Sequence, residues 1–160
     1  MLVFAAWAAR LLREHFTSVL KTEDVQRLAG NVGYCDFSDV IIRDIVELVE
    51  SVVPVDLSEP SYCRVSDSNT GTVWHDDHGT KKHMAWCDYS ASMLLTPSSD
   101  FTGGGLYFDD APDLAIHHFN ELIVWSNDDV CNRHYVAKSR GSRIVLLMFF
   151  QGGETDGRRD

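Results

Sequence analysis

The sequence has no long apolar run, and this absence argues against a membrane-spanning helix. Such a helix needs about 20 consecutive apolar residues, whereas the apolar stretch from Met1 to Ala9 ends at Arg10. The same stretch has no basic start and no clear cleavage site, so we expect neither a signal peptide nor a membrane span. A cytoplasmic protein is the default expectation, and a lumenal domain of the secretory pathway is expected if the chain is a fragment.

Basic residues are also scarce. The 160 residues include 14 Lys and Arg against 24 Asp and Glu, which gives a formal net charge of -10. Proteins that bind nucleic acids present a basic patch or stripe to the phosphate backbone. No such stripe is visible in the sequence, so we expect no nucleic-acid partner.

Cysteines are few and widely spaced. The four thiols contain no CxxC pair, which argues against a zinc site built from four cysteines. A chain of this size does not need disulfides as its main staple. We therefore expect reduced thiols at Cys35, Cys63, Cys87 and Cys131, with the redox compartment left open.

Residues 1–54 have the apolar spacing of helices. The pattern predicts one helix over residues 3–16, a short one capped by Thr22, and a third capped by Ser38 and stopped by Pro54. The third carries an apolar stripe from Ile41 to Val53 at a period near 3.6.

After Pro60 the apolar period changes to two, which indicates β-strands separated by polar turns. The expected strands cover residues 62–66, 72–77, 86–95, 105–108, 114–119, 121–126, 134–138 and 143–150. Eight short strands favour an antiparallel sandwich or barrel with the helices packed outside it. We expect one domain over residues 1–160, with helical support in 1–54, a β core in 61–151 and a frayed tail in 152–160.

A possible metal site lies in the second half of the chain. His75 and Asp77 are two residues apart on an expected strand, so their side chains project from the same face. With a histidine from a distant strand, such as His134, they would form the two-histidine, one-carboxylate triad that binds Fe(II) and leaves coordination positions open. Arg143 follows nine residues later and can pair bidentately with a carboxylate.

This combination resembles the prolyl 4-hydroxylase-like branch of the Fe(II)/2-oxoglutarate-dependent dioxygenases, in particular the 2-oxoglutarate and iron-dependent oxygenase domain-containing proteins. The likeness covers residues 61–151, and its most specific string is DFTGGGLYF at 100–108. The other matching strings are WHDD at 74–77, DYSASMLL at 88–95, NRHYV at 132–136 and GSRIVL at 141–146.

The resemblance implies a double-stranded β-helix, or jelly roll, with flanking N-terminal helices. It implies that His75, Asp77 and His134 hold Fe(II) and that Arg143 binds the C5 carboxylate of 2-oxoglutarate. The implied reaction is hydroxylation of a peptidyl substrate, prolyl residues included, or of a small molecule, with release of succinate and CO2. Ascorbate is the implied reductant.

One departure concerns co-substrate binding. The family usually has a tyrosine where Leu94 stands, and its phenol helps to hold the C5 carboxylate. Leu94 cannot donate a hydrogen bond, so either 2-oxoglutarate is held more weakly or the pocket is rebuilt. Ser92, on the same expected face, or Ser90 can supply a hydroxyl instead.

Other residues and functions also fit parts of this pattern. His78 is an alternative metal ligand if the strand carries a bulge, but it lacks an Asp two residues on. His117 and His118 are interpreted as structural or surface residues, and His83 as part of a solvated loop. A cupin-like metalloenzyme that needs no 2-oxoglutarate and an inactive binding module on the same fold remain alternatives.

Overall fold

The computed structural model describes residues 13–57, 61–77, 84–115 and 117–153. Most of the predicted helix over residues 3–16 lies outside these ranges. Its last four residues form strand β1 (Arg13–Phe16) and not a helix. The helical prediction is wrong there because the backbone of Arg13–Phe16 pairs with a neighbouring strand, and tertiary pairing overrides a local pattern.

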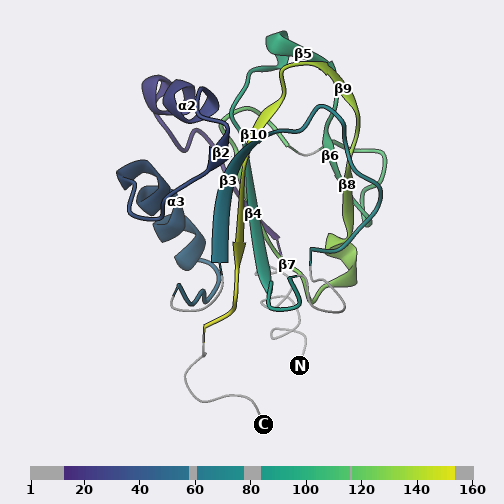
Figure 1. Cartoon of the computed structure of the whole chain (residues 1–160). Helices are drawn as coiled ribbons and strands as arrows, with labels where there is room; N and C mark the ends of the chain where they lie inside the picture. The colour runs from purple at the N-terminus through teal and green to yellow at the C-terminus, as the bar shows by residue number, and fades with distance from the viewer. Residues whose placement is uncertain (1–12, 58–60, 78–83, 116, 154–160) are drawn as a thin grey trace.

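The framework is an antiparallel sheet of six strands in the order β1-β7-β4-β10-β3-β2 (Figure 1). Its other strands are β2 (Gly33–Tyr34), β3 (Ser61–Asp67), β4 (Tyr89–Leu94), β7 (Leu122–Ser126) and β10 (Ile144–Phe150). In the centre, Leu146 of β10 lies opposite Val65 on one side and Met93 on the other. All seven residues of β10 are apolar, as expected of a strand whose two faces are both covered.

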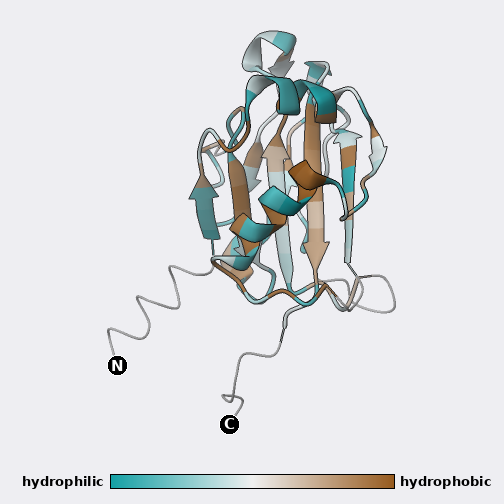
Figure 2. Ribbon diagram, turned by 90° about the vertical axis from the view of Figure 1, so that its left-hand side faces the viewer, coloured by the Kyte–Doolittle hydropathy of each residue, from teal (hydrophilic) through white to brown (hydrophobic). Residues whose placement is uncertain are grey.

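Two helices cover one face of this sheet. They are α2 (Thr22–Ala29) and α3 (Val40–Glu50). Figure 2 views this side and shows apolar and polar residues alternating along the helices in front of the sheet. Ile42, Ile45 and Val49 are buried against the sheet in one apolar cluster with Met93 and Leu146. The predicted apolar stripe is therefore the face that α3 turns to the core.

Both predicted helix caps are off by one residue. The Asp39 carboxylate, not Ser38, accepts the first backbone N–H groups of α3, from Ile41 and Ile42. The α2 cap position is occupied by Lys21, which makes no side-chain cap, and Thr22 is already helical. A carboxylate at Asp39 also pairs with Arg27 of α2 at 2.8 Å, which ties the two helices together.

Short strands form a second layer on the opposite side of the sheet (Figure 1). β5 (Phe101–Gly103) pairs with β9 (Ser139–Gly141), and β6 (Leu106–Phe108) pairs with β8 (His134–Val136). Two 3-10 turns, Ser98–Asp100 and Val130–Asn132, lie at their ends. Two antiparallel layers closed around an interior are the jelly-roll arrangement that the sequence predicts.

Two expected strands are not regular strands. Residues 72–77 make backbone hydrogen bonds to β8 from Thr72 and His75, and only His75 forms a bridge, opposite His134. The described residues of the expected strand 114–119 form one β-bridge to the sheet, between Phe119 and Leu94. Each segment touches its neighbour too briefly to continue a ladder, although each matters for the site described below.

Three further findings concern the tail of the chain, the cysteines and membrane-spanning helices. The first residues of the predicted frayed tail are held in place, because Gly152 donates to the Asp88 carboxylate and Gly153 to the Pro54 carbonyl. The remainder of that tail, residues 154–160, lies outside the described ranges. All four cysteines are free. Among the described residues, no helix has the length and apolarity to cross a bilayer.

Candidate active site

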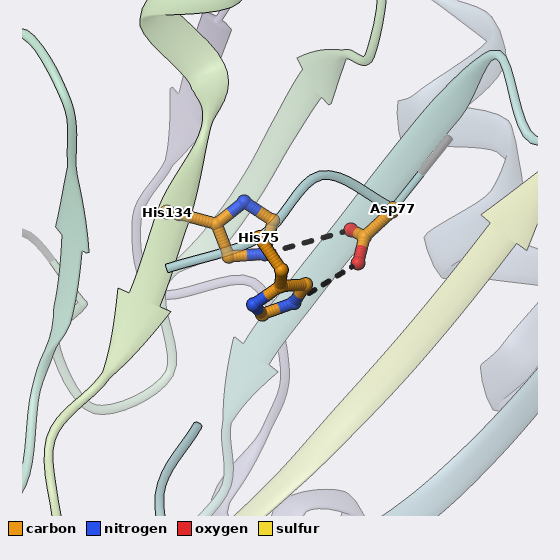
Figure 3. A group of neighbouring side chains, drawn as sticks. All are labelled: His75, Asp77 and His134. Atoms are coloured by element: carbon orange, nitrogen blue, oxygen red, sulfur yellow. Dashed lines mark ion pairs between the residues drawn. The ribbon is translucent and has the colours of Figure 1, made fainter. Parts of the chain in front are cut away.

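Three side chains converge between the two layers (Figure 3). Their ligand atoms, from His75, Asp77 and His134, all lie within 4.8 Å of one another. His75 Nε2 is 3.4 Å from one Asp77 carboxylate oxygen, and His134 Nε2 is 3.6 Å from the other. The geometry therefore gathers the three residues that the sequence nominates as metal ligands.

Reciprocal backbone bonds bring the two histidines together. The His75 N–H donates to the His134 carbonyl at 2.9 Å, and the His134 N–H donates back at 3.0 Å. Both imidazoles are then oriented in the same way, by a carbonyl two residues earlier in the chain. Nδ1 of His75 lies 2.8 Å from the Val73 carbonyl, and Nδ1 of His134 lies 2.9 Å from the Asn132 carbonyl.

These Nδ1 contacts determine which nitrogen can bind a metal. A carbonyl oxygen can only accept, so Nδ1 of each ring carries the hydrogen. In the neutral rings Nε2 is then the nitrogen that can present a lone pair, and in both rings it faces Asp77. In the charged form of His75 the same Nε2 carries a hydrogen and donates it to Asp77, and a metal ion bound there would replace that proton. A second hydrogen bond that holds the ring in this way is the usual support of a metal-ligating histidine.

The Asp77 carboxylate is supported from the large sheet. Burial alone would raise the pKa of Asp77, but hydrogen bonds from His75 and Ser90 and the nearby His134 lower it overall. Ser90 of β4 is buried, and its hydroxyl accepts a hydrogen bond from the Asn127 amide at 2.9 Å. The Ser90 hydroxyl therefore links Asn127 to an ionised Asp77.

The surroundings shift the pKa values of the two histidines in opposite directions. The hydrogen bond to Asp77 raises the pKa of His75, whereas burial lowers the pKa of His134. Two imidazoles and one carboxylate, with ligand atoms turned to a common point, suit Fe(II) or a similar divalent ion and leave coordination positions for other ligands. The donor set therefore fits the iron that the resemblance implies.

A cavity of about 200 Å³ opens beside this centre, and Arg143 lies at its wall. Arg143 precedes β10 and is only 1% exposed. Its Nη1 donates to the Ser68 hydroxyl at 2.6 Å, and its Nη2 to Nδ1 of His117 at 3.1 Å. Burial lowers the pKa of Arg143 to about 10, so the guanidinium stays charged at neutral pH.

Neither polar partner of Arg143 carries a negative charge. Within residues 13–57, 61–77, 84–115 and 117–153, no carboxylate forms an ion pair with it. Gly104 makes room for its stem, since a Cβ at that glycine would lie 2.9 Å from the Arg143 Cδ. A buried cation without a counter-ion is unfavourable unless a ligand supplies the charge.

Searches with the sequence find no matching family model and no matching curated protein. Solved structures do match. A viral collagen prolyl hydroxylase from Paramecium Bursaria Chlorella virus-1, in its 2OG complex, superposes with a TM-score of 0.66 at 10% identity, covering 89% of this chain and 96% of the other. A prolyl-4-hydroxylase from Pseudomonas putida gives 0.63 at 12%, covering 89% and 93%.

A prolyl hydroxylase from Trichoplax adhaerens, in complex with a hypoxia inducible factor peptide fragment, gives a TM-score of 0.62 at 14% identity and covers 88% and 83%. The chain has the prolyl hydroxylase fold. The fold implied by the sequence resemblance is therefore confirmed, and at these identities the likeness concerns the fold.

Within the prolyl hydroxylase fold, the other nominated residues take distinct places. Ser92 of β4 is buried and lines the cavity. Ser90 instead supports Asp77. Leu94 is buried at the end of the same strand. His78 and His83 lie outside the described residues.

Sequence reasoning missed His117. The structure buries this residue in the cavity wall beside Arg143, while His118 next to it is exposed. No sequence signal identifies it, because it comes from an irregular segment with no motif. The indole of Trp125 also lines the cavity, with its ring 5.0 Å from that of His134, and its buried N–H has no acceptor in the described part of the chain.

Proposed function

We propose that this chain is an Fe(II)- and 2-oxoglutarate-dependent dioxygenase that hydroxylates a peptidyl or small-molecule substrate and releases succinate and CO2. The observation that carries the proposal is the uncompensated Arg143 guanidinium in the same cavity as the His75, Asp77 and His134 cluster. A metal centre and a buried cation in one cavity suit a ligand that chelates the metal at one end and carries a carboxylate at the other.

Each residue then has a defined role. His75, Asp77 and His134 hold iron, with Nδ1 of both histidines fixed to backbone carbonyls and Nε2 available to the metal. Arg143 binds the far carboxylate of 2-oxoglutarate, and Ser92 lines the channel between the two ends. Bound iron and 2-oxoglutarate supply the oxidation chemistry, and the protein supplies orientation and a shielded cavity.

Arg143 favours this function over a metalloenzyme that needs no 2-oxoglutarate. In such a protein Arg143 would be a structural residue, and a structural arginine buried at 1% exposure is normally paired with a carboxylate. The inactive-module alternative is disfavoured by the intact cluster, because His75 and His134 both retain the carbonyl contacts that orient metal-ligating rings.

For the substrate, we propose a prolyl residue in a peptide as the first class to test. The support is the Trichoplax adhaerens structure, which contains a peptide fragment, and the name of the viral protein as a collagen prolyl hydroxylase. Small molecules remain the second class.

Anaerobic titration with Fe(II) and then 2-oxoglutarate tests the proposal. We expect iron to bind and 2-oxoglutarate to produce the weak visible metal-to-ligand charge-transfer band of the chelate. Iron binding without the band would favour the metalloenzyme that needs no 2-oxoglutarate, and no iron binding would contradict both. Aerobic succinate release, with ascorbate present and prolyl peptides matched to proline-free controls, then tests the substrate class.

A further inference from the structure

We propose that His117 is a second anchor for the distal carboxylate of 2-oxoglutarate, donating its Nε2–H to the group that Arg143 binds. This inference rests on the proposed function and assigns a role to a residue that no motif identifies. It also explains how the chain can hold the co-substrate with a leucine at position 94, where the family it resembles usually has a tyrosine.

The contact with Arg143 determines the tautomer of His117. A guanidinium has five N–H donors and no acceptor. Its Nη2 lies 3.1 Å from Nδ1 of His117, so Nδ1 must present a lone pair and the ring hydrogen must be on Nε2. Burial and the charge of Arg143 lower the pKa of His117 to about 3, which keeps the ring neutral at physiological pH.

The Nε2–H group has no partner of its own. His117 is 7% exposed, and its Nε2 makes no hydrogen bond to any described residue. The backbone of Ser92 interacts with the ring and favours its protonated form, but burial outweighs this contact and the pKa of His117 stays low. Buried donors are almost always satisfied in folded proteins, so an exception in a cavity wall points to a ligand acceptor.

The backbone around His117 places its Nε2–H group near the end of β4. Phe119 forms a parallel bridge with Leu94, and the Asn120 N–H donates to the Leu94 carbonyl at 2.9 Å. The segment carrying His117 therefore runs beside the end of β4, next to the strand position from which a tyrosine would reach the carboxylate. His117 and Arg143 together present donors and no acceptor to that end of the cavity.

Three variants test the assignment: His117→Leu, His117→Gln and, as the matched control at the exposed neighbour, His118→Leu. Each Fe(II)-loaded protein is titrated anaerobically with 2-oxoglutarate and with pyruvate, a 2-oxo acid that lacks the distal carboxylate. We expect His117→Leu to weaken 2-oxoglutarate roughly 10-fold to 100-fold and to leave pyruvate and iron affinity unchanged. Glutamine can accept from Arg143 and donate onward, so His117→Gln should recover most of the loss.

The tautomer gives a test that needs no substitution. In the wild-type protein loaded with Zn(II) as a diamagnetic substitute, the nitrogen resonances of His117 should show a protonated Nε2 and an unprotonated Nδ1. The Nε2–H signal should move when 2-oxoglutarate is added. A proton on Nδ1 would overturn the assignment even if the leucine variant failed to fold.

The outcomes separate this inference from the proposed function. If the wild-type protein binds 2-oxoglutarate and His117→Leu binds it within twofold, the anchor role is wrong and the proposed function stands. Equal weakening of 2-oxoglutarate and pyruvate would also overturn the anchor, because it would indicate general disruption of the cavity. If the wild-type protein forms no 2-oxoglutarate complex, the proposed function fails and the anchor role fails with it.

Discussion

Replacing Arg143 with methionine should stabilise the ligand-free protein and at the same time weaken 2-oxoglutarate binding roughly 100-fold or more. Methionine fills much of the volume of the arginine stem but carries no charge. The gain in stability and the loss of 2-oxoglutarate affinity have one cause. The Arg143 guanidinium is 1% exposed and has no counter-ion among the described residues. A structural arginine would give the reverse result for stability.

The magnitudes follow from the environment of the guanidinium. Burial lowers the pKa of Arg143 from its ordinary value to about 10, which corresponds to a cost of about 3 kcal/mol for the charged form. Loss of the bonds to Ser68 and His117 forfeits about 1 kcal/mol each. The net gain in unfolding free energy should therefore be about 1 kcal/mol. Two charge-assisted bonds to a carboxylate contribute about 3–6 kcal/mol, so affinity should fall roughly 100-fold or more.

Two measurements check this prediction. Urea denaturation of the metal-free protein gives the change in unfolding free energy, and anaerobic titration of the Fe(II) protein gives the dissociation constant for 2-oxoglutarate. Arg140→Met, at an exposed arginine of β9, is the matched control and should change neither quantity appreciably. Destabilisation of Arg143→Met by more than 2 kcal/mol, or 2-oxoglutarate affinity within a few-fold of wild type, would refute the reasoning.

Three further predictions concern the metal centre and its surroundings. Asp77→Asn should lower Fe(II) affinity at least 100-fold, whereas Asp76→Asn, at its exposed neighbour, should not; equal losses by calorimetry would contradict the ligand assignment. Ser90→Ala removes the hydroxyl that holds Asp77 and should weaken iron roughly 10-fold to 100-fold, with exposed Ser99→Ala as its control. Because the folded-state pKa of His117 is about 3, the unfolded chain takes up a proton that the folded chain does not as pH falls below about 6.5. Stability should then fall by up to about 1.4 kcal/mol per pH unit between 6.5 and 3, and His117→Leu should reduce that slope in urea denaturation at pH 7, 6 and 5. An identical slope in the variant would show that His117 is already charged in the fold.

The apolar periodicity of the sequence predicts the elements that bury one whole face along their length. The stripe of α3 and the strands that become β3, β4, β7 and β10 each bury a full face, so the pattern of their residues reflects the packing. The HxD spacing likewise nominates His75 and Asp77, although they do not lie on a regular strand. The single bridge from His75 to His134 of β8 is enough to turn the His75 and Asp77 side chains toward the same point, as a strand would.

Features that depend on tertiary contacts could not be predicted from the sequence. β1 (Arg13–Phe16) reads as the end of a helix, and only its pairing with β7 makes it a strand. His117 reads as an ordinary histidine, because its tautomer, burial and low pKa all come from Arg143, which is 26 residues away in the chain. Ser90 is visible in the sequence as a hydroxyl on β4, but its contact with Asp77 is not.

The two layers of the fold contribute different parts of the cavity. The short-strand layer supplies both histidines, joined by reciprocal backbone bonds between His75 and His134. The large sheet supplies Ser90 on β4, and Arg143 directly precedes β10 of the same sheet. In the proposed function, metal binding and carboxylate binding would thus be carried by opposite walls. Asp77, held by His75 on one side and by Ser90 on the other, connects the two walls. Under the proposed function, the separation of these groups across the cavity would select a ligand with a chelating end and an anionic end, and neither motif alone identifies such a ligand.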